Sequence, residues 1–212
     1  MSAQKLAKRS TPATKRRERD RLLRRSDILA AAEKTFATQG FHETRIEQIA
    51  QEAGYAAGTI YLYFADKESL YAALFVHKIE QMVAHVETRT KLARDPLDGL
   101  RLAVRAQLEF HDENREFFDL FVRQRLHASP GADDPWQEVV THYRRHFKVL
   151  VDMIELAQKE KLLRKTESHL LASALLGSIV QIARRAQREG STEPLVKHAA
   201  FVCDLFLNGA KT

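Results

Sequence analysis

Hydrophobic positions along this chain recur every three or four residues, which is the spacing of one buried face of an α-helix. No segment shows the regular alternation of a half-buried β-strand, and Ala, Leu, Glu, Gln, Arg and Lys dominate the composition. The pattern predicts an all-α protein. A first helix is expected to start between Arg19 and Ser26 and to end near Gln39. Further helices are predicted over residues 44–53, 57–63, 67–92, 96–111, 115–127, 136–160, 167–189 and 194–207.

The second and third predicted helices are short and are joined by a turn at Gly54. Thr44 and Glu47 have the spacing of a capping box, in which Thr44 accepts from the amide of Glu47 and Glu47 reaches back to the amide of Thr44. Gly54 has no Cβ and can take the left-handed conformation of a tight turn between helices. This is the build of a helix-turn-helix, which places its second helix in the DNA major groove.

The third predicted helix carries small and hydroxyl-bearing residues that suit a DNA groove. Ala57 and Gly58 let the start of the helix approach the duplex closely, and its free amides attract phosphate. Thr59 and Tyr61 offer hydroxyl groups at the groove surface. Tyr63 can donate its hydroxyl to a phosphate. We therefore expect this helix to contact DNA.

Lys67 begins the fourth predicted helix, where the helix dipole disfavours a cation. A phosphate lying between the helix and the ammonium group would account for this position. Thr44 and Arg45 lie at the start of the second helix, where contact with the DNA backbone is also expected. The alternative is that Tyr61 and Tyr63 are core aromatics and Lys67 is a solvated charge.

The segment from Gly54 to Phe64 and the Asp66-Lys67-Glu68 that follows it closely resemble the signature of the tetracycline-repressor (TetR) family. The resemblance extends over about residues 26–75 and includes upstream matches at Phe36-Ala37, Gly40-Phe41, Thr44 and Ile49-Ala50. It implies a helix-turn-helix domain of three helices, joined through a long helix to a larger helical domain that binds a ligand and dimerises. It also implies DNA contacts by Thr44, Tyr61, Tyr63 and Lys67.

Three residues depart from the pattern of that family. Ala56 stands where serine is frequent and cannot cap the third helix with its side chain. Ala57 replaces a residue that is commonly polar or basic, and Leu62 is apolar where the family is often polar. The helix therefore has few donors for base edges. We expect specificity to come from Thr59, Tyr61, Arg45, contacts of Ala57 with thymine methyl groups, and DNA shape.

The excess positive charge lies at the N-terminus. Residues 1–25 hold ten basic and two acidic side chains, a net charge of +8, whereas the whole chain carries +6 and the remainder therefore −2. We expect a flexible basic arm over residues 1–22, a DNA-binding domain over 23–70 and an effector-binding and dimerisation domain over 71–212. The arm suits phosphate or minor-groove contact. The alternative is a solvated extension without a specific role.

The predicted second domain is rich in aromatic residues that can line an apolar ligand pocket between helices. The alternative is ordinary core packing. The family resemblance implies a pocket in this domain but does not identify its walls. Few polar groups lie within the aromatic run, so we expect a hydrophobic or weakly polar effector. The candidate pocket residues are Phe110, Phe117, Phe121, Trp136, Tyr143, Phe147 and Ile179.

The last two predicted helices are apolar on more than one face, so one face should meet the core and the other a partner. The family resemblance implies a symmetric dimer formed by these helices as a four-helix bundle. Such a dimer would place two reading helices roughly 34–36 Å apart, in successive major grooves of a palindromic site. The alternative is a helix pair buried within a monomer. The candidate interface residues are Leu171, Ala174, Leu175, Ser178, Ile182, Ala199, Cys203 and Phe206.

Other functional classes have less support in the sequence. His142 and His146, with Glu138, have helical spacing that could share a metal, but catalytic and metal-binding motifs are missing, so we expect no enzyme activity, no metal and no cofactor. Cys203 is the single cysteine and is expected to be an inert thiol. An architectural DNA-binding protein without a ligand stays open, and a cavity in the second domain would discriminate against it.

These observations predict a ligand-responsive transcription regulator, most simply a repressor that binds a palindromic DNA operator as a homodimer and is released by a small hydrophobic effector. No apolar run is long enough to cross a membrane and no secretory signal is recognisable, so we expect a cytoplasmic protein without membrane contact.

Overall fold

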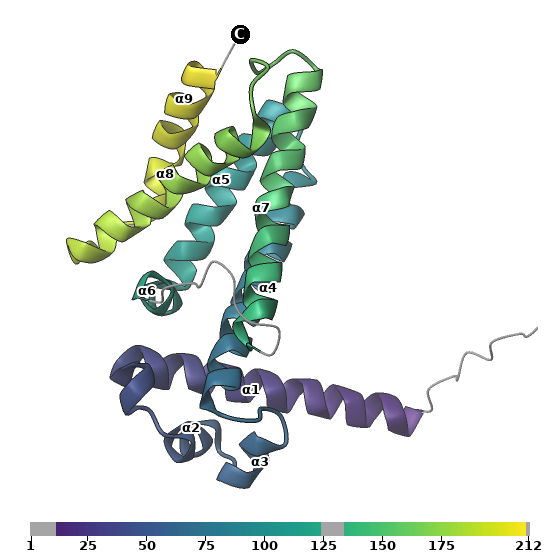
Figure 1. Ribbon diagram of the computed structural model, residues 1–212, viewed down its shortest axis with the longest axis vertical. Coiled ribbons are helices and arrows are strands. Elements are labelled where there is room, and N and C mark those ends of the chain that lie inside the picture. The colour runs from purple at the N-terminus through teal and green to yellow at the C-terminus, as the bar shows by residue number, and fades with distance from the viewer. Residues whose placement is uncertain (1–11, 124–133, 211–212) are drawn as a thin grey trace, which may run out of the picture. The chain divides into compact units, whose positions relative to one another are not determined.

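The computed structural model of the chain describes residues 12–123 and 134–210 (Figure 1). Every regular element in these residues is helical, which confirms the predicted all-α fold. The contacts separate into two compact units, Met1–Leu70 and Tyr71–Thr212, and the division falls inside helix α4. The elements are α1 (Pro12–Glu43), α2 (Ile46–Ala53), α3 (Ala57–Tyr61), α4 (Lys67–Thr90), α5 (Pro96–Glu113), α6 (Arg115–Arg123), α7 (Trp136–Lys159), α8 (Ser168–Arg188), the 3₁₀ helix η1 (Leu195–His198) and α9 (Ala199–Ala210).

In the first unit, α1 packs on α2 and α2 packs on α3. The apolar stripe of α1 faces this core, where Ile28 and Phe36 have no exposed surface. Ile49 of α2 and Ile60 of α3 are also fully buried. Each such side chain contributes about 1.5–3 kcal/mol when it leaves water. Burial of one face from each helix therefore holds together three helices that are too short or too polar to be stable alone.

Gly54 closes the turn between α2 and α3 as predicted. Its φ of 73° and ψ of 26° lie in the left-handed region, where a residue with a Cβ is strained. The N–H of Tyr55 donates to Ala50 O at 2.9 Å and so satisfies a carbonyl at the end of α2. The chain can then turn sharply into α3.

The predicted start of the first helix is wrong, whereas its predicted end near Gln39 is confirmed by a break in the helical backbone at Gly40. Helix α1 begins at Pro12, so residues 12–22 of the expected flexible arm are helical, whereas residues 1–11 lie outside the described part of the chain. Proline is favourable in the first helical turn because no amide is needed there. At Gly40 the backbone leaves the helical region, with φ of 80° and ψ of 166°, and a short second helical stretch then runs to Glu43.

The predicted capping box is one residue out of place. The backbone N–H of Arg45, the residue before α2, donates to Gln48 Oε1 at 2.8 Å. Thr44 and Glu47 do not form the box, because the hydroxyl of Thr44 donates instead to Gly40 O at 2.7 Å. Thr44 therefore stabilises the end of α1 rather than the start of α2.

In the second unit, α5 is the central helix and packs on α7, α8, α9 and η1 (Figure 1). It begins at Pro96 as predicted, and Asp95 caps it by accepting from the N–H of Asp98 at 2.8 Å. The core lies where the apolar faces of these helices meet. It includes the almost completely buried residues Leu100, Ala103, Val104, Leu108, Leu150, Ile154, Leu175 and Ile179.

A polar connection joins the end of α5 to the start of η1. The carboxylate of Asp112 accepts from the N–H groups of Leu195 and Val196, at 2.9 and 3.1 Å, where a helix start offers unpaired donors. Arg115 donates to the same carboxylate at 2.6 Å and to the carbonyl of Ser191 at 2.7 Å. The last two helices are thereby fixed against α5 and α6.

Candidate functional site

Helix α3 and the residues after it present a polar and an apolar face. Ile60 and Phe64 point into the core, with 0% and 5% of their surface exposed. Tyr61 is 53% exposed, and Thr59 and Tyr63 are partly exposed. The hydroxyl groups of Tyr61 and Thr59 are therefore accessible to a ligand that binds the first unit.

The start of α3 is open, as its sequence suggests. Ala56 precedes the helix and makes no side-chain cap, while Ala57 and the exposed Gly58 leave space around the first turn. Leu62 is the most exposed large apolar residue of this region, with 78% of its surface in solvent. This surface offers backbone amides, hydroxyls and methyl groups, and it lacks a charged side chain between residues 55 and 65.

Lys67 is held by the backbone of its own unit. Its Nζ donates to the carbonyl oxygens of Phe41, His42 and Thr44 at 2.7, 3.1 and 2.9 Å. The same Nζ lies 4.6 Å from the centroid of the Phe41 ring, within the range of a cation–π interaction. An ammonium group has three N–H donors, so these carbonyls use all of them. The three carbonyls also compensate for a cation at a helix N-terminus.

The side chain of Thr44 is also buried and already hydrogen-bonded. Only 1% of its surface is exposed, and its hydroxyl is used by Gly40 O. Arg45, by contrast, is exposed at the start of α2. Of the two neighbouring residues that the sequence associates with DNA backbone contact, the structure leaves only the side chain of Arg45 accessible.

The first two turns and the middle of α1 form a basic surface. Lys15, Arg16, Arg17, Arg19, Arg21 and Arg24 are all exposed on this helix. Arg25 is half-buried, and its guanidinium lies 5.5 Å from the ring centroid of Phe64. Because residues 12–25 are helical, these charges are spaced along a continuous helix rather than along a loop.

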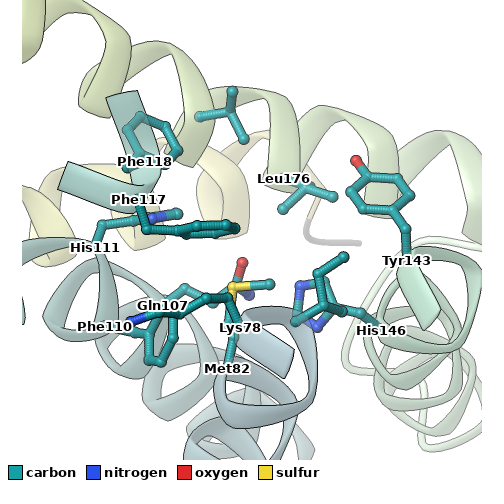
Figure 2. A pocket seen from close by; sticks show the side chains of 12 residues that line it. Lys78, Met82, Gln107, Phe110, His111, Phe117, Phe118, Tyr143, His146 and Leu176 are labelled. Carbon is teal, nitrogen blue, oxygen red and sulfur yellow. The ribbon is translucent and has the colours of Figure 1, made fainter. Parts of the chain in front are cut away.

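The second unit contains a partly open cavity of about 30 Å³, which has room for at least one water molecule (Figure 2). Helices α4, α5, α6, α7 and α8 all contribute to its wall, as the side chains of Figure 2 show. The wall is mostly apolar and aromatic. It is formed by Lys78, Ile79, Met82, Gln107, Phe110, His111, Phe117, Phe118, Tyr143, His146, Leu176 and Val180.

Three polar side chains of this wall are buried and have atoms that form no hydrogen bond within the described residues. Gln107, His111 and His146 are 0%, 8% and 1% exposed. In the part of the chain that the structure describes, both amide atoms of Gln107, both ring nitrogens of His146 and Nε2 of His111 make no hydrogen bond. Burial lowers the pKa of each histidine to about 4, and His146 contributes to the lowered pKa of His111. Both imidazoles are therefore neutral at pH 7.

A larger open groove of about 760 Å³ runs along α7 and α8. It shares Tyr143, Leu176 and Val180 with the smaller cavity, so these side chains form the common wall between the two spaces. Lys148 lies on the groove and is paired with Asp152 at 2.6 Å. The groove therefore has an apolar wall, and Lys148 at its edge has its charge balanced by Asp152.

The residues predicted to line a pocket lie in different places in the structure. Phe110, Phe117 and Tyr143 line the cavity, and Phe147 lines the groove. Trp136 instead packs edge-on against Phe75, with ring centroids 5.1 Å apart. Ile179 is a fully buried core residue. The side chain of Phe121 lies outside the described residues.

The sequence interpretation missed the polar part of the cavity. Gln107 and His111 are four residues apart on α5 and flank Phe110, which was singled out as a pocket residue. That spacing places them on one helix face and was a usable signal. His146, which the sequence offered only as a weak metal candidate with His142, is buried. His142 lies 3.6 Å from Glu80, and no cluster of metal-ligating side chains occurs within residues 12–123 and 134–210.

The residues predicted for a dimer interface also divide into two groups. Leu171, Leu175 and Cys203 belong to the core of the chain, with 7%, 1% and 9% of their surface exposed. Ala174 is exposed, and Ser178, Ile182, Ala199 and Phe206 are partly exposed. The large apolar residues that are most exposed on α8 and α9 were not among those predicted. They are Leu170, Phe201 and Leu205, with 61%, 62% and 58% of their surface exposed.

A helix-turn-helix unit with an open reading helix, joined to a helical unit with an internal cavity, defines a class of transcription regulators. The chain belongs to the TetR family. Residues 28–74 match the family described as bacterial regulatory proteins of the tetR family, and residues 93–210 match the tetracyclin repressor-like C-terminal domain. Among the described residues, no helix is both long and apolar enough to span a membrane.

Several known regulators are similar to this chain. The transcriptional repressor NicS of Pseudomonas putida is 31% identical over 156 residues, which cover 71% of this chain and 73% of NicS. The fatty acid metabolism regulator protein of Bacillus subtilis is 36% identical over 77 residues, which cover 36% of this chain and only 40% of that regulator. The crystal structure of FadR from Bacillus subtilis in complex with stearoyl-CoA has a TM-score of 0.77 and 23% identity, and the match covers 87% of this chain and 98% of FadR.

We predict that Lys67→Met will destabilise the first unit. The substitution leaves three carbonyls without their charged donor, which should lower the free energy of unfolding by about 1.5–3 kcal/mol. Urea denaturation followed by circular dichroism measures this change. The matched control is Lys15→Met on the exposed surface of α1, for which less than about 0.5 kcal/mol is expected. Equal stability of the two variants would show that the carbonyl contacts of Lys67 contribute little.

Proposed function

We propose that this protein is a repressor that binds a palindromic DNA operator as a homodimer and is released by a small hydrophobic effector. The observation that supports this most directly is the course of α4. Its first residue, Lys67, holds the backbone of the helix-turn-helix unit, and its later residues Lys78, Ile79 and Met82 form part of the cavity wall. One helix therefore carries residues that matter to both sites.

DNA contact is proposed for the accessible polar groups of the first unit. Thr59, Tyr61 and Tyr63 supply hydroxyls, and Ala57 and Gly58 permit close approach of the α3 backbone. Arg45 and the basic surface of α1 supply charge for phosphates. Thr44 and Lys67 are proposed to act indirectly, because their polar groups position the backbone around α2 and α3.

Dimerisation is proposed through the outer faces of α8 and α9. Leu170, Phe201 and Leu205 expose more than half of their surfaces there, which is unfavourable for large apolar side chains in water. The exposed small residue Ala174 on α8 would allow a partner helix to approach closely. A symmetric dimer would also supply two reading helices for a palindromic operator.

The effector is proposed to occupy the cavity and the adjoining groove of the second unit. The cavity wall contains side chains from five helices, so a bound molecule would alter the packing of α4 against the others. Release then follows if the effector binds more tightly to the DNA-incompetent state than to the DNA-bound state. FadR from Bacillus subtilis was crystallised with stearoyl-CoA, which makes acyl chains the first effector class to examine.

An architectural DNA-binding protein was the alternative left open by the sequence. Such a protein needs no internal cavity and gains nothing from buried polar groups without partners. The cavity with Gln107 and His146 in its wall therefore favours the ligand-responsive regulator.

We expect Phe201→Glu to convert a dimer into a monomer, because a carboxylate at the centre of an apolar contact would be desolvated without a partner. Size-exclusion chromatography with light scattering should then give 24.3 kDa in place of twice that mass. Leu92→Glu is the control, since Leu92 is 74% exposed and precedes α5, away from α8 and α9 in sequence. A Phe201→Glu protein that keeps the mass of the dimer would exclude this surface.

The salt dependence of operator binding distinguishes residues that contact DNA phosphates from residues that only position the backbone. For a palindromic site selected from random duplexes, Arg45→Gln should lower the slope of log K against log salt by about one per half-site, because a phosphate contact is lost. Tyr61→Phe should weaken binding by about fivefold with little change in slope. Lys67→Met should weaken binding with an unchanged slope. A reduced slope for Lys67→Met would assign Lys67 a direct phosphate contact.

Effector release is tested with the intact protein on the same operator. We expect at least one of stearoyl-CoA, stearic acid and decan-1-ol to bind the protein and to lower operator affinity by about tenfold or more, measured by fluorescence anisotropy. Leu92→Glu should respond like the natural sequence. If every compound that binds the protein leaves operator affinity unchanged, the proposed release mechanism is wrong.

A further inference from the structure

The polar side chains of the cavity are not required by the packing of the second unit. Gln107 and His146 are almost completely buried, yet none of their four polar side-chain atoms has a partner among residues 12–123 and 134–210. An unpaired buried polar group costs free energy that an apolar side chain of similar shape would not cost. The remainder of the cavity wall shows that apolar residues fit here.

One buried water molecule cannot satisfy these groups. Counted over the described residues, the cavity wall has five unpaired atoms, namely two on Gln107, two on His146 and Nε2 of His111. A single water in this small cavity makes about three hydrogen bonds and at most four. One water therefore leaves at least one of these atoms unpaired, whereas a ligand with several polar atoms can pair more of them.

The polar groups of the wall are matched to an uncharged partner. The amide of Gln107 both donates and accepts, and each neutral imidazole carries one donor and one acceptor. Lys78 is the charged residue of the wall, and its Nζ donates to Asn114 Oδ1 at 2.7 Å. A carboxylate only accepts hydrogen bonds, so it would leave the acceptor atoms of Gln107 and of the two imidazoles unpaired.

The adjoining groove has room for the apolar part of a ligand whose polar group lies in the cavity. The cavity and the groove share the wall formed by Tyr143, Leu176 and Val180, and the groove is far larger than the cavity. In Figure 2 the side chains of Leu176 and Tyr143 lie on one side of the cavity and Gln107 lies across from them. Movement of these wall side chains would join the two spaces.

We propose that Gln107, His111 and His146 bind an uncharged group that both donates and accepts hydrogen bonds, a carboxamide or a hydroxyl, on an otherwise apolar effector. The apolar part of the effector passes Tyr143, Leu176 and Val180 and lies along the groove between α7 and α8. This assignment rests on the proposed function for its regulatory meaning. It specifies the chemical class of the effector, which the proposed function leaves open.

The proposal is tested by calorimetric titration of the full-length protein without DNA. The probes are octanamide, octanoate and 1-chlorooctane, which share a chain length and differ in the terminal group. The natural sequence should bind octanamide at least about tenfold more tightly than either of the others, because a buried polar group gains a partner. Repeating the octanamide titration in two buffers of different ionisation enthalpy should give the same heat, since no proton is taken up.

Substitution of the polar residues should remove this preference. Gln107→Leu and His146→Leu should bind octanamide and 1-chlorooctane equally within about threefold, and Gln107→Met provides a second apolar variant if leucine does not fold. Thermal unfolding of Gln107→Leu should occur at the same or a higher temperature, because an unpaired amide has been removed. Gln137→Leu, on the exposed surface of α7, is the matched control and should keep the preference.

Several results would overturn the proposal. These are failure of all three probes to bind the natural sequence, tighter binding of octanoate or 1-chlorooctane than of octanamide, and an unchanged preference in Gln107→Leu. A lower unfolding temperature for Gln107→Leu with unchanged binding would show that the three residues only stabilise the fold through water. Because DNA takes no part in these titrations, binding without operator release would count against the proposed function alone.

Discussion

The arrangement of the first unit depends on one cation that is held by backbone carbonyls. The ammonium group of Lys67 stands at the N-terminus of α4, where the helix dipole opposes it, and the carbonyls of Phe41, His42 and Thr44 surround it. Those carbonyls belong to the end of α1 and the connection to α2. The contact therefore joins the segments before and after α2 and α3, and it holds the open face of α3 in place without using any residue of that face.

The second unit contains polar groups that its fold does not satisfy. Its core is apolar, and other polar groups are paired, as in the contacts of Asp112 with η1. Within the residues that the structure describes, Gln107, His111 and His146 bring five unpaired buried atoms together in the wall of one cavity. A fold that is stabilised by many buried apolar side chains can tolerate such a local cost, and functional sites are where this cost is commonly found. The cavity and the reading helix therefore differ in their physical basis, since one depends on unsatisfied groups and the other on exposed ones.

Much of the fold could be predicted because the signals are local. Apolar spacing located the helices, Gly54 located the turn, and Asp95 with Pro96 located the start of α5. The misplaced capping box shows the limit of such signals. Thr44 and Arg45 are adjacent and either could precede α2, and the choice was made by the carbonyl of Gly40, which takes the Thr44 hydroxyl. The pocket was predicted in part, because aromatic content locates an apolar region but does not say which side chains of that region share a wall.

The sequence by itself determined the all-α class, the helix-turn-helix and its family, because these follow from periodicity and from a motif of fixed spacing within about fifty residues. The tertiary structure alone decided which polar groups are used. It brought Lys67 to carbonyls more than twenty residues away, and it placed Gln107 and His146 from different helices in one cavity. The physical reason is that helix formation responds to neighbours in the chain, whereas burial and hydrogen-bond partners are set by which helix faces meet.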